Sequence, residues 1–315
     1  MSGPAISPEP SLQTSGGPKP ARVDVVAEFE SGFDDPTESW PGPKGGLAHR
    51  PQALVFSFFG GVVGEDKLPP IPTAVYLRLF GRIGIAEAAA RAALARMVRK
   101  GLLDRQQEGR TAHYRLTPTA DELVRRATGR VLSTTPFEHP DGEWTLLSYS
   151  MPESRRDLRH KLRATLAWSG FGGVRDGLWI APGEKDVTNI FAAAGLTEIL
   201  QHADWFAASP MPGVELEKLI RRAWPVDQIR SAHDYFIRQW SSQDASDPLG
   251  KLTVLGADWL RLLRMDPGLP ARYLSNDWPS EHSTALFHER YRALLPGGKR
   301  ALRRELGLPD VLIAK

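Results

Sequence analysis

Apolar residues recur at helical spacing in the segment from Glu87 to Lys100, and shorter patterned segments flank it on both sides. The apolar face of this predicted helix comprises Ile85, Ala89, Leu94, Met97 and Val98. The opposite face carries small and basic side chains, which are Ala88, Arg91, Ala92, Ala95 and Arg99. Gly101 follows where a glycine commonly ends a helix. The pattern therefore predicts an amphipathic helix whose polar face has no bulky side chain to keep another surface away.

Two short β-like runs follow this helix, over residues 102–107 and 111–116. Between them, Glu108-Gly109-Arg110 is typical of a hairpin turn, because glycine adopts a positive φ without strain. Upstream, Thr73 is placed to cap a helix over residues 73–82. A helix, a tight turn at Gly84-Ile85, a second helix and a hairpin follow the order of a winged helix-turn-helix. In that motif the second helix enters the major groove of DNA.

The candidate DNA contacts come from the second helix and the hairpin. On the helix they are Arg91, Ala92, Ala95, Arg96 and Arg99. On the hairpin, the candidate donors for phosphates or the minor groove are Arg105, Arg110, His113 and Arg115. A helix with one apolar and one basic face is more often an ordinary solvated surface helix. The hairpin and the distribution of charge favour the DNA-binding interpretation.

Charge is unevenly distributed along the chain. Residues 51–130 contain thirteen Lys or Arg against seven Asp or Glu, whereas residues 1–50 contain four against seven. The whole chain of 315 residues has a formal net charge of only +3. The positive charge is therefore concentrated on the segment with the helix and hairpin pattern. A basic segment of this kind attracts nucleic-acid phosphates in a salt-dependent manner.

The remaining pattern predicts an α+β protein of several domains. Residues 1–48 are rich in Pro, Gly and Ser and are expected to form a disordered arm. Residues 49–132 form the winged-helix domain. Residues 143–208 contain strands predicted over 144–149, 177–181 and 199–207 with two helices between them, which suggests a ferredoxin-like domain. Residues 213–296 are helical almost throughout, and residues 297–315 are expected to be a peripheral tail.

Several function classes find no support in the sequence. The chain has no cysteine, so disulfides and cysteine-based zinc sites are excluded. No apolar run approaches 18 residues and no secretory signal precedes the domains, so a cytoplasmic protein without membrane spans is expected. The strand over 144–149 offers no carboxylate for the metal of a nuclease, and His282 and His288 do not share a helix face. No catalytic residue, metal site or cofactor is predicted.

Several segments together resemble the PaaX-type transcriptional regulators, named for the repressor of phenylacetate degradation. The first segments are Phe56-Ser57-Phe58-Phe59-Gly60, Arg91 to Val98 with Gly101-Leu102-Leu103, and Tyr114-Arg115-Leu116-Thr117. The more specific segments are Trp259 with Arg261 and Arg264, Asp266-Pro267-Gly268-Leu269-Pro270, Asp277-Trp278-Pro279, Ala285-Leu286-Phe287 and Tyr291. The resemblance covers about residues 51–296. The arm before it departs from the family pattern.

The resemblance implies a winged helix, a central ferredoxin-like domain similar to Cas2, and a helical C-terminal domain. It also implies homodimers on palindromic operators and release from DNA by an acyl-CoA effector. For the dimer, we expect residues 143–295 to supply the contacts, because the winged-helix segment has no spare apolar helix. No single residue of this sequence supports the acyl-CoA effector that the resemblance implies.

Residues that could hold an aromatic or acyl effector are drawn from the C-terminal half. The candidates are Trp259, Arg261, Arg264, Arg272 and Trp278. For each tryptophan, ordinary core packing is the alternative interpretation. The main hypothesis is a ligand-responsive repressor of a catabolic operon. A constitutive DNA-binding protein without an effector, and an enzyme acting on an acyl-CoA or a nucleic acid, remain alternatives.

Overall fold

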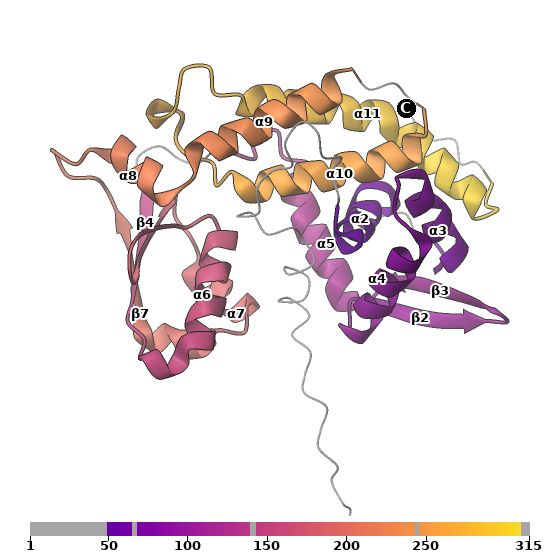
Figure 1. Cartoon of the computed structure of the whole chain (residues 1–315), viewed down its shortest axis with the longest axis horizontal. Coiled ribbons are helices and arrows are strands. Elements are labelled where there is room, and N and C mark those ends of the chain that lie inside the picture. The colour runs from indigo at the N-terminus through magenta and orange to yellow at the C-terminus, as the bar shows by residue number, and fades with distance from the viewer. Residues whose placement is uncertain (1–48, 65–67, 139–142, 243–245, 310–315) are drawn as a thin grey trace, which may run out of the picture.

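A computed structural model describes residues 49–64, 68–138, 143–242 and 246–309. The predicted N-terminal arm lies outside these residues. Figure 1 shows helices α2 to α5 with a β-hairpin on one side, a four-stranded sheet on the other, and the long helices α9, α10 and α11 running across both. The chain is therefore arranged in three parts joined along one row of helices.

The first part consists of short helices and a three-stranded sheet. Its elements are α2 (Pro51–Phe58), the π-helix η1 (Phe59–Val63), β1 (Ile71–Pro72), α3 (Thr73–Arg82), α4 (Glu87–Arg99), β2 (Leu103–Glu108), β3 (Thr111–Leu116) and α5 (Pro118–Val131). The strands are antiparallel in the order β1-β3-β2. The predicted order of two helices followed by a hairpin is therefore present in space.

Glycines and one threonine set the turns of this part. Gly84 between α3 and α4, Gly101 after α4 and Gly109 at the hairpin tip all have positive φ, which glycine tolerates best. The Thr117 side chain caps α5 by accepting a hydrogen bond from Ala120 N, and it donates to Gly101 O at 2.8 Å. Thr73 does not cap α3 as predicted. It is the first residue of the helix, and its hydroxyl instead donates to Ala112 O of β3 at 2.8 Å.

The buried face of α4 differs slightly from the predicted one. Ala90, Ala93, Leu94 and Met97 are buried, whereas Ala89 is exposed. The face is rotated because α3, α2 and the hairpin all pack against the side of α4 that carries Ala90 and Ala93. Periodicity alone could not show which of three consecutive alanines is the buried one.

The central part has one strand more than predicted. Its elements are β4 (Trp144–Tyr149), α6 (Arg156–Trp168), β5 (Gly172–Arg175), β6 (Leu178–Pro182), α7 (Val187–Ala193) and β7 (Ala203–Ala208), with a 3-10 helix over Thr197–His202. The chain order is β-α-β-β-α-β, and the antiparallel sheet has the order β5-β6-β4-β7. The prediction missed β5 because its glycines are typical of a helix end. A Cβ on Gly172 would lie 2.6 Å from the Trp224 ring, so the glycine permits close packing of β5 on the end of the helix Leu216–Ala223.

The C-terminal part comprises α8 (Leu216–Ala223), α9 (Val226–Ser241), α10 (Pro248–Met265) and α11 (Ser280–Glu305). The prediction of a peripheral tail after residue 296 was wrong, since α11 continues through Pro296 to Glu305. Gly298 lies so close to α10 that an added Cβ would be 3.0 Å from Leu252, and Leu302 is buried. Glu305 then accepts hydrogen bonds from Arg78 and Arg82 of α3. Tertiary contacts stabilise a helix that Pro and Gly would otherwise end.

Two hydrophobic clusters form the interior. The large cluster runs from α2, α3 and α4 through α9, α10 and α11 and reaches one face of the central sheet through Trp144 and Trp224. The small cluster lies between the other face of that sheet and helices α6 and α7. Helix α2 packs on α10, where Ser57 Oγ donates to Thr253 O at 2.7 Å. The first part and the C-terminal helices therefore share one core.

Candidate nucleic-acid interface

Helix α4 presents an exposed face of small and basic side chains. Arg91, Ala92, Ala95, Arg96 and Arg99 are all exposed, and the residues between them are buried or half-buried. The alanines leave the backbone open to close approach by a second surface. The hairpin β2–β3 extends from the base of the same helix bundle, as Figure 1 shows. This combination is suited to a helix lying in a groove with a hairpin beside it.

The arginines of α4 differ in their partners. Arg91 is paired within the helix, since its Nη2 and Nε both lie 2.8 Å from Glu87 Oε1. Arg96 and Arg99 make no side-chain hydrogen bond or ion pair within the described ranges. Sequence reasoning missed the role of Glu87, although its i, i+4 spacing from Arg91 was a usable signal. An incoming phosphate or base would meet Arg96 and Arg99 directly and would compete with Glu87 for Arg91.

The strand register divides the predicted hairpin donors between two faces. Arg105 pairs with Tyr114, so its side chain lies on the same face as this core residue. His113 and Arg115 lie two residues apart and share the opposite face, where His113 Nε2 is 3.6 Å from Glu108 and Arg115 Nε is 3.5 Å from Asp104. Arg110 is exposed at the tip. The fold therefore does not bring all four predicted donors to one surface.

The predicted effector residues do not form a single pocket. Trp259 is fully buried, stacks on Phe287 with ring centroids 4.6 Å apart, and donates from Nε1 to Val131 O at 3.0 Å. It is therefore a core residue. The Arg264 guanidinium lies 3.1 Å from the ring centroid of Trp168. Arg272 is exposed and lies over Tyr273. Neither these residues nor Arg261 line the pocket that contains Trp278.

The pocket beside Trp278 has a volume of about 380 Å³ and lies between the segment after α5, the loop after α10 and the start of α11. Its ionisable lining residues are Glu138, Asp266 and Glu281, and none of the described lining residues is Lys or Arg. A ligand phosphate or carboxylate would find no cation in this lining. The pocket therefore does not match the charged part of an acyl-CoA.

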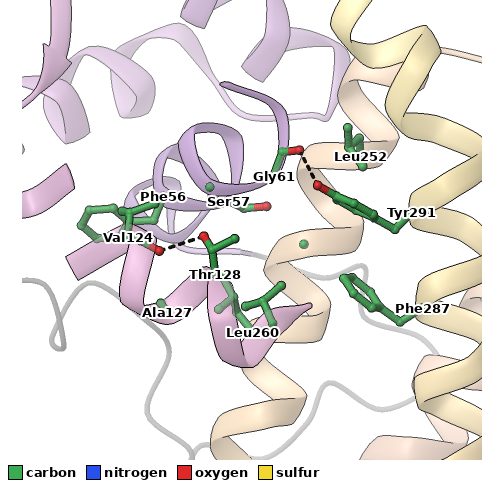
Figure 2. Close-up of a pocket in the computed structure, with 13 residues that line it drawn as sticks. Phe56, Ser57, Gly61, Val124, Ala127, Thr128, Leu252, Leu260, Phe287 and Tyr291 are labelled. Carbon is green, nitrogen blue, oxygen red and sulfur yellow. Dashed lines mark hydrogen bonds between the residues drawn. The ribbon is translucent and has the colours of Figure 1, made fainter. Parts of the chain in front are cut away.

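A second, apolar pocket lies where the first part meets the C-terminal helices (Figure 2). Its volume is about 30 Å³, and no charged residue is among those that line it. Val124 and Ala127 of α5 face Leu260 of α10 and Phe287 of α11 across it. Tyr291 closes one side by donating to Gly61 O at 3.2 Å. Sequence reasoning missed this pocket because its lining comes from four segments that are distant in the chain.

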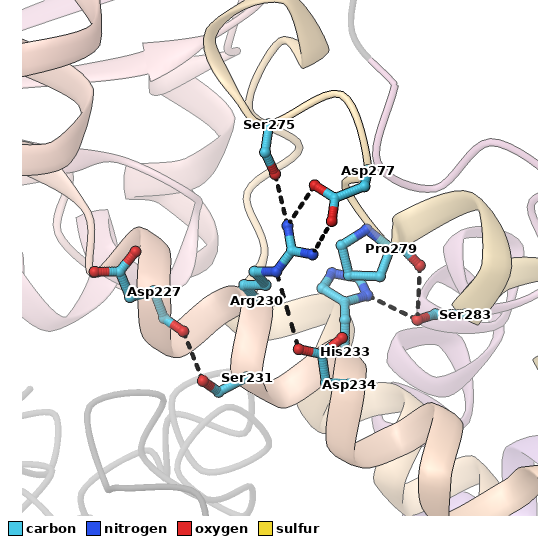
Figure 3. A network of polar contacts seen from close by, with 9 residues as sticks. All are labelled: Asp227, Arg230, Ser231, His233, Asp234, Ser275, Asp277, Pro279 and Ser283. Carbon is cyan, nitrogen blue, oxygen red and sulfur yellow. Dashed lines mark hydrogen bonds and ion pairs between the residues drawn. The ribbon is translucent and has the colours of Figure 1, made fainter.

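A buried polar network links α9, the loop after α10 and the start of α11 (Figure 3). His233 Nδ1 is 2.9 Å from Ser283 Oγ, and His233 Nε2 is 2.8 Å from Asp266 Oδ2. All three side chains are at most 1% exposed, so no substrate can reach the serine hydroxyl. The arrangement resembles a Ser-His-Asp triad in composition, but its burial makes it a structural network.

The outer part of the same network is exposed. Arg230 donates two hydrogen bonds to Asp277, at 3.0 and 2.6 Å, and a third to Ser275 at 2.6 Å. The hydrogen bonds from Arg230, followed by that from Ser275, lower the pKa of Asp277 to about 2. These contacts hold the loop that precedes α11 against α9.

Two cations meet where α5 approaches the central part. Burial, followed by the nearby Arg130 charge, lowers the pKa of Lys185 to about 8. Burial also lowers the pKa of Arg130, and the Asp266 charge opposes this effect. Arg130 donates from Nη2 to Leu263 O at 2.9 Å. This junction is therefore electrostatically unfavourable between the two parts, in contrast to the continuous core elsewhere.

Comparison with known proteins matches the three parts in order. Residues 50–120 match the family model described as PaaX-like protein, residues 138–220 the PaaX protein central Cas2-like domain, and residues 224–304 the PaaX-like protein C-terminal domain. The resemblance seen in the sequence is thereby confirmed. No helix within the described ranges combines the length and apolar character needed to cross a bilayer.

Two individual proteins are similar over most of their length. The Transcriptional repressor PaaX of Escherichia coli (strain K12) is 24% identical over 234 residues, which is 69% of this chain and 72% of that protein. The structure of uncharacterized protein Rv0674 from Mycobacterium tuberculosis has a TM-score of 0.53 and 24% identity, and the match covers 80% of this chain and 98% of the other. The structural similarity concerns the fold alone.

Proposed function

Because the chain belongs to the PaaX-like protein family, we propose that it is a cytoplasmic transcriptional repressor that binds double-stranded DNA. The first part is proposed to be a winged helix-turn-helix, and the central β-α-β-β-α-β part a ferredoxin-like domain. The observation that carries the proposal is the exposed face of α4, where three arginines alternate with small alanines beside a hairpin. The related protein is a transcriptional repressor, so the proposal assigns no enzymatic activity to this chain.

The individual contacts follow from the geometry of this face. Arg91, Arg96 and Arg99 lie along α4, and an arginine in the major groove reads guanine through two hydrogen bonds. Arg105 and Arg110 are proposed to contact phosphates or the minor groove. His113 and Arg115 lie on the opposite hairpin face with carboxylate neighbours, so their proposed role is weaker.

The repressor is proposed to act as a homodimer on a palindromic operator. One recognition helix reads only a few base pairs, which is too little to select one site in a genome. Two copies related by a two-fold axis present their helices to half-sites about 34 Å apart, or a multiple of that distance. The target is proposed to be a catabolic operon, with phenylacetate catabolism as the first to test, because the related protein carries the PaaX name.

A small-molecule effector is proposed to release the repressor, with an acyl-CoA as the first class to test. The apolar pocket between α5 and helices α10 and α11 supports this proposal, because its uncharged lining suits an acyl or aryl group. At about 30 Å³ it would have to widen to admit one. Widening would move α5 relative to α10, and α5 belongs to the DNA-binding part. A constitutive DNA-binding protein without an effector is the alternative.

Footprinting of the purified chain on the DNA upstream of its own gene tests the proposal. The expected result is protection of a palindrome at a concentration that leaves random DNA of the same length unbound. Phenylacetyl-CoA should remove the protection, whereas free coenzyme A should not. Equal affinity for both DNAs would overturn sequence-specific repression. Protection that no acyl-CoA or free aromatic acid changes would favour the constitutive alternative.

A further inference from the structure

Exposed large hydrophobic side chains gather on one strand and the loop after it. Among the described residues, the exposed large hydrophobics are Leu132, Trp205, Phe206, Met211 and Val214. Four of these five lie between residues 205 and 214. The strand concerned is β7, at the left border of Figure 1 and away from α2 to α5. A cluster of this kind on a protein surface commonly marks an interaction site.

Among the strands that the structure describes, β7 lies at an edge of its sheet. It is the last strand in the sheet order β5-β6-β4-β7, and β4 is its one neighbour among the described strands. Ser150 N donates to His202 O, which makes this opposing pair a hydrogen-bonded one. Since such pairs alternate, Asp204 and Phe206 direct their backbone groups toward β4. The backbone N–H and C=O groups of Ala203, Trp205 and Ala207 therefore point outward.

We propose that β7 pairs in antiparallel orientation with β7 of a second copy of this chain, with Phe206 opposite Phe206 of that copy. The proposal rests on the proposed function, which requires two recognition helices. An antiparallel edge is complementary to itself about a two-fold axis, so one strand supplies both sides of the interface. The two four-stranded sheets would join into one continuous sheet.

The charge on β7 selects among the possible registers. Residues whose backbone groups point outward must oppose one another, so Asp204 and Phe206, whose backbone groups point toward β4, can oppose only residues of this second kind, which include Ala208. A register centred on Asp204 would place two carboxylates directly opposite, which is unfavourable. A register centred on Trp205 would place Asp204 against Phe206. The register centred on Phe206 pairs the two aromatic rings and leaves Asp204 opposite Ala208.

The apolar area indicates how far the interface extends. The exposed parts of Trp205, Phe206, Met211 and Val214 supply on the order of 400 Å² per copy, about half of what a standard interface buries on each partner. The surface of the strand alone is therefore too small for a standard interface. The loop that carries Met211 and Val214 must also contact the second copy, together with neighbouring polar surface.

Single-cysteine cross-linking tests both the interface and its register. The chain has no cysteine, so each variant carries one thiol. Phe206→Cys should form a disulfide-linked dimer under mild oxidation, because residues in a non-hydrogen-bonded pair have Cα atoms about 4.5 Å apart. The matched control Asp204→Cys lies two residues away on the same face. It should not cross-link, since the two thiols would be separated by several residues along the strands.

The outcomes distinguish the alternatives. Efficient cross-linking of Phe206→Cys alone supports the proposal. Cross-linking of Asp204→Cys alone, or equal cross-linking of both variants, would overturn the register centred on Phe206. Absence of cross-linking in both variants would overturn the interface.

Sedimentation of the full chain without DNA gives an independent measurement. The wild type should be a dimer at micromolar concentration. Phe206→Asp should weaken the dimer by at least about a hundredfold, because the two-fold axis brings both new carboxylates together. Phe206→Leu should remain dimeric, and unchanged circular dichroism would show that both variants are folded. A wild type that is monomeric yet footprints an operator would overturn this interface while leaving the proposed function intact.

Discussion

The large hydrophobic cluster joins the DNA-binding part to the C-terminal helices, whereas the small cluster lies between one face of the central sheet and helices α6 and α7. In the large cluster, residues such as Ser57 and Thr253 are in contact although they are far apart in the chain. In the small cluster, every buried residue comes from the central part. The two clusters therefore differ in what they connect.

This difference suggests how the parts act on one another. Helix α4 contacts α2, and α2 packs on α10, so a displacement of the C-terminal helices has a direct route to the exposed basic face of α4. The central sheet contacts α8 of the C-terminal part, and among the described strands β7 has one edge without a partner strand. The first arrangement suits regulation of DNA binding, and the second suits assembly. The following substitutions test this division.

Trp259→Ala should have the largest effect. Removing this fully buried ring should lower the free energy of unfolding by about 3–5 kcal/mol. Hydrogen exchange should increase in α10 and also in α2 and α4, because they share its cluster. The control Trp259→Phe keeps most of the stacking on Phe287 and should cost less. Faster exchange confined to α10 and α11 would show that the shared core does not couple the two parts.

Leu162→Ala makes the corresponding change in the small cluster. This fully buried residue of α6 should contribute about 2–4 kcal/mol to stability. Hydrogen exchange should increase in α6 and α7 and remain unchanged in α4. The affinity of the folded variant for DNA should match that of the wild type. An affinity loss as large as that of Trp259→Ala would contradict the division into two functional regions.

Arg91→Ala tests base reading by α4. We expect a loss of about 1–3 kcal/mol in binding free energy on the specific site and a much smaller loss on random DNA. The control Arg125→Ala removes an exposed arginine of α5 that is paired with Asp121 and Glu122, and it should have little effect. Equal losses on both DNAs, measured by titration at one salt concentration, would show that Arg91 contacts phosphate.

Lys185→Gln tests the junction between the two regions. The folded pKa of about 8 lies below the unfolded value of 10.5, so the folded state loses its proton first as the pH rises. The cost of burying the charge is complete below pH 8 and disappears as the pH approaches 10.5. The variant should therefore be more stable than the wild type at pH 7, on the order of 1–2 kcal/mol after screening of this partly exposed group. Denaturant unfolding should show this advantage shrinking at pH 9.5; a constant difference would contradict it.

Arg110→Ala should have the smallest effect. An arginine at the hairpin tip that contacts phosphate should weaken binding to all sequences similarly and lower the salt slope by about 1. Arg115→Ala is the matched comparison, because Arg115 lies on the hairpin face opposite that of Arg105 and beside Asp104. Its salt slope should change less than that of Arg110→Ala. An effect of Arg115→Ala as large as that of Arg110→Ala would show that the opposite hairpin face also approaches DNA.

The local sequence pattern was sufficient to predict the helices and strands, but it was insufficient to predict which residues form a binding site. The helix over Glu87–Arg99 and the hairpin around Gly109 were predicted because their periodicity and turn glycines act over a few residues. Trp259 was misassigned as an effector candidate because tryptophan in a core and tryptophan in a pocket look alike in sequence. Trp259 proved to be a core residue once the packing of Phe287 was known.

The sequence by itself determined the three-part order, the exposed basic face of α4 and the absence of cysteine chemistry, because these depend on composition and short-range spacing. Only the tertiary structure decided that α11 continues past Pro296, that Gly172 belongs to a strand and that Ser283 contacts His233. Each of these depends on a partner distant in the chain. Packing against that partner outweighs local propensity, and the sequence alone does not name the partner.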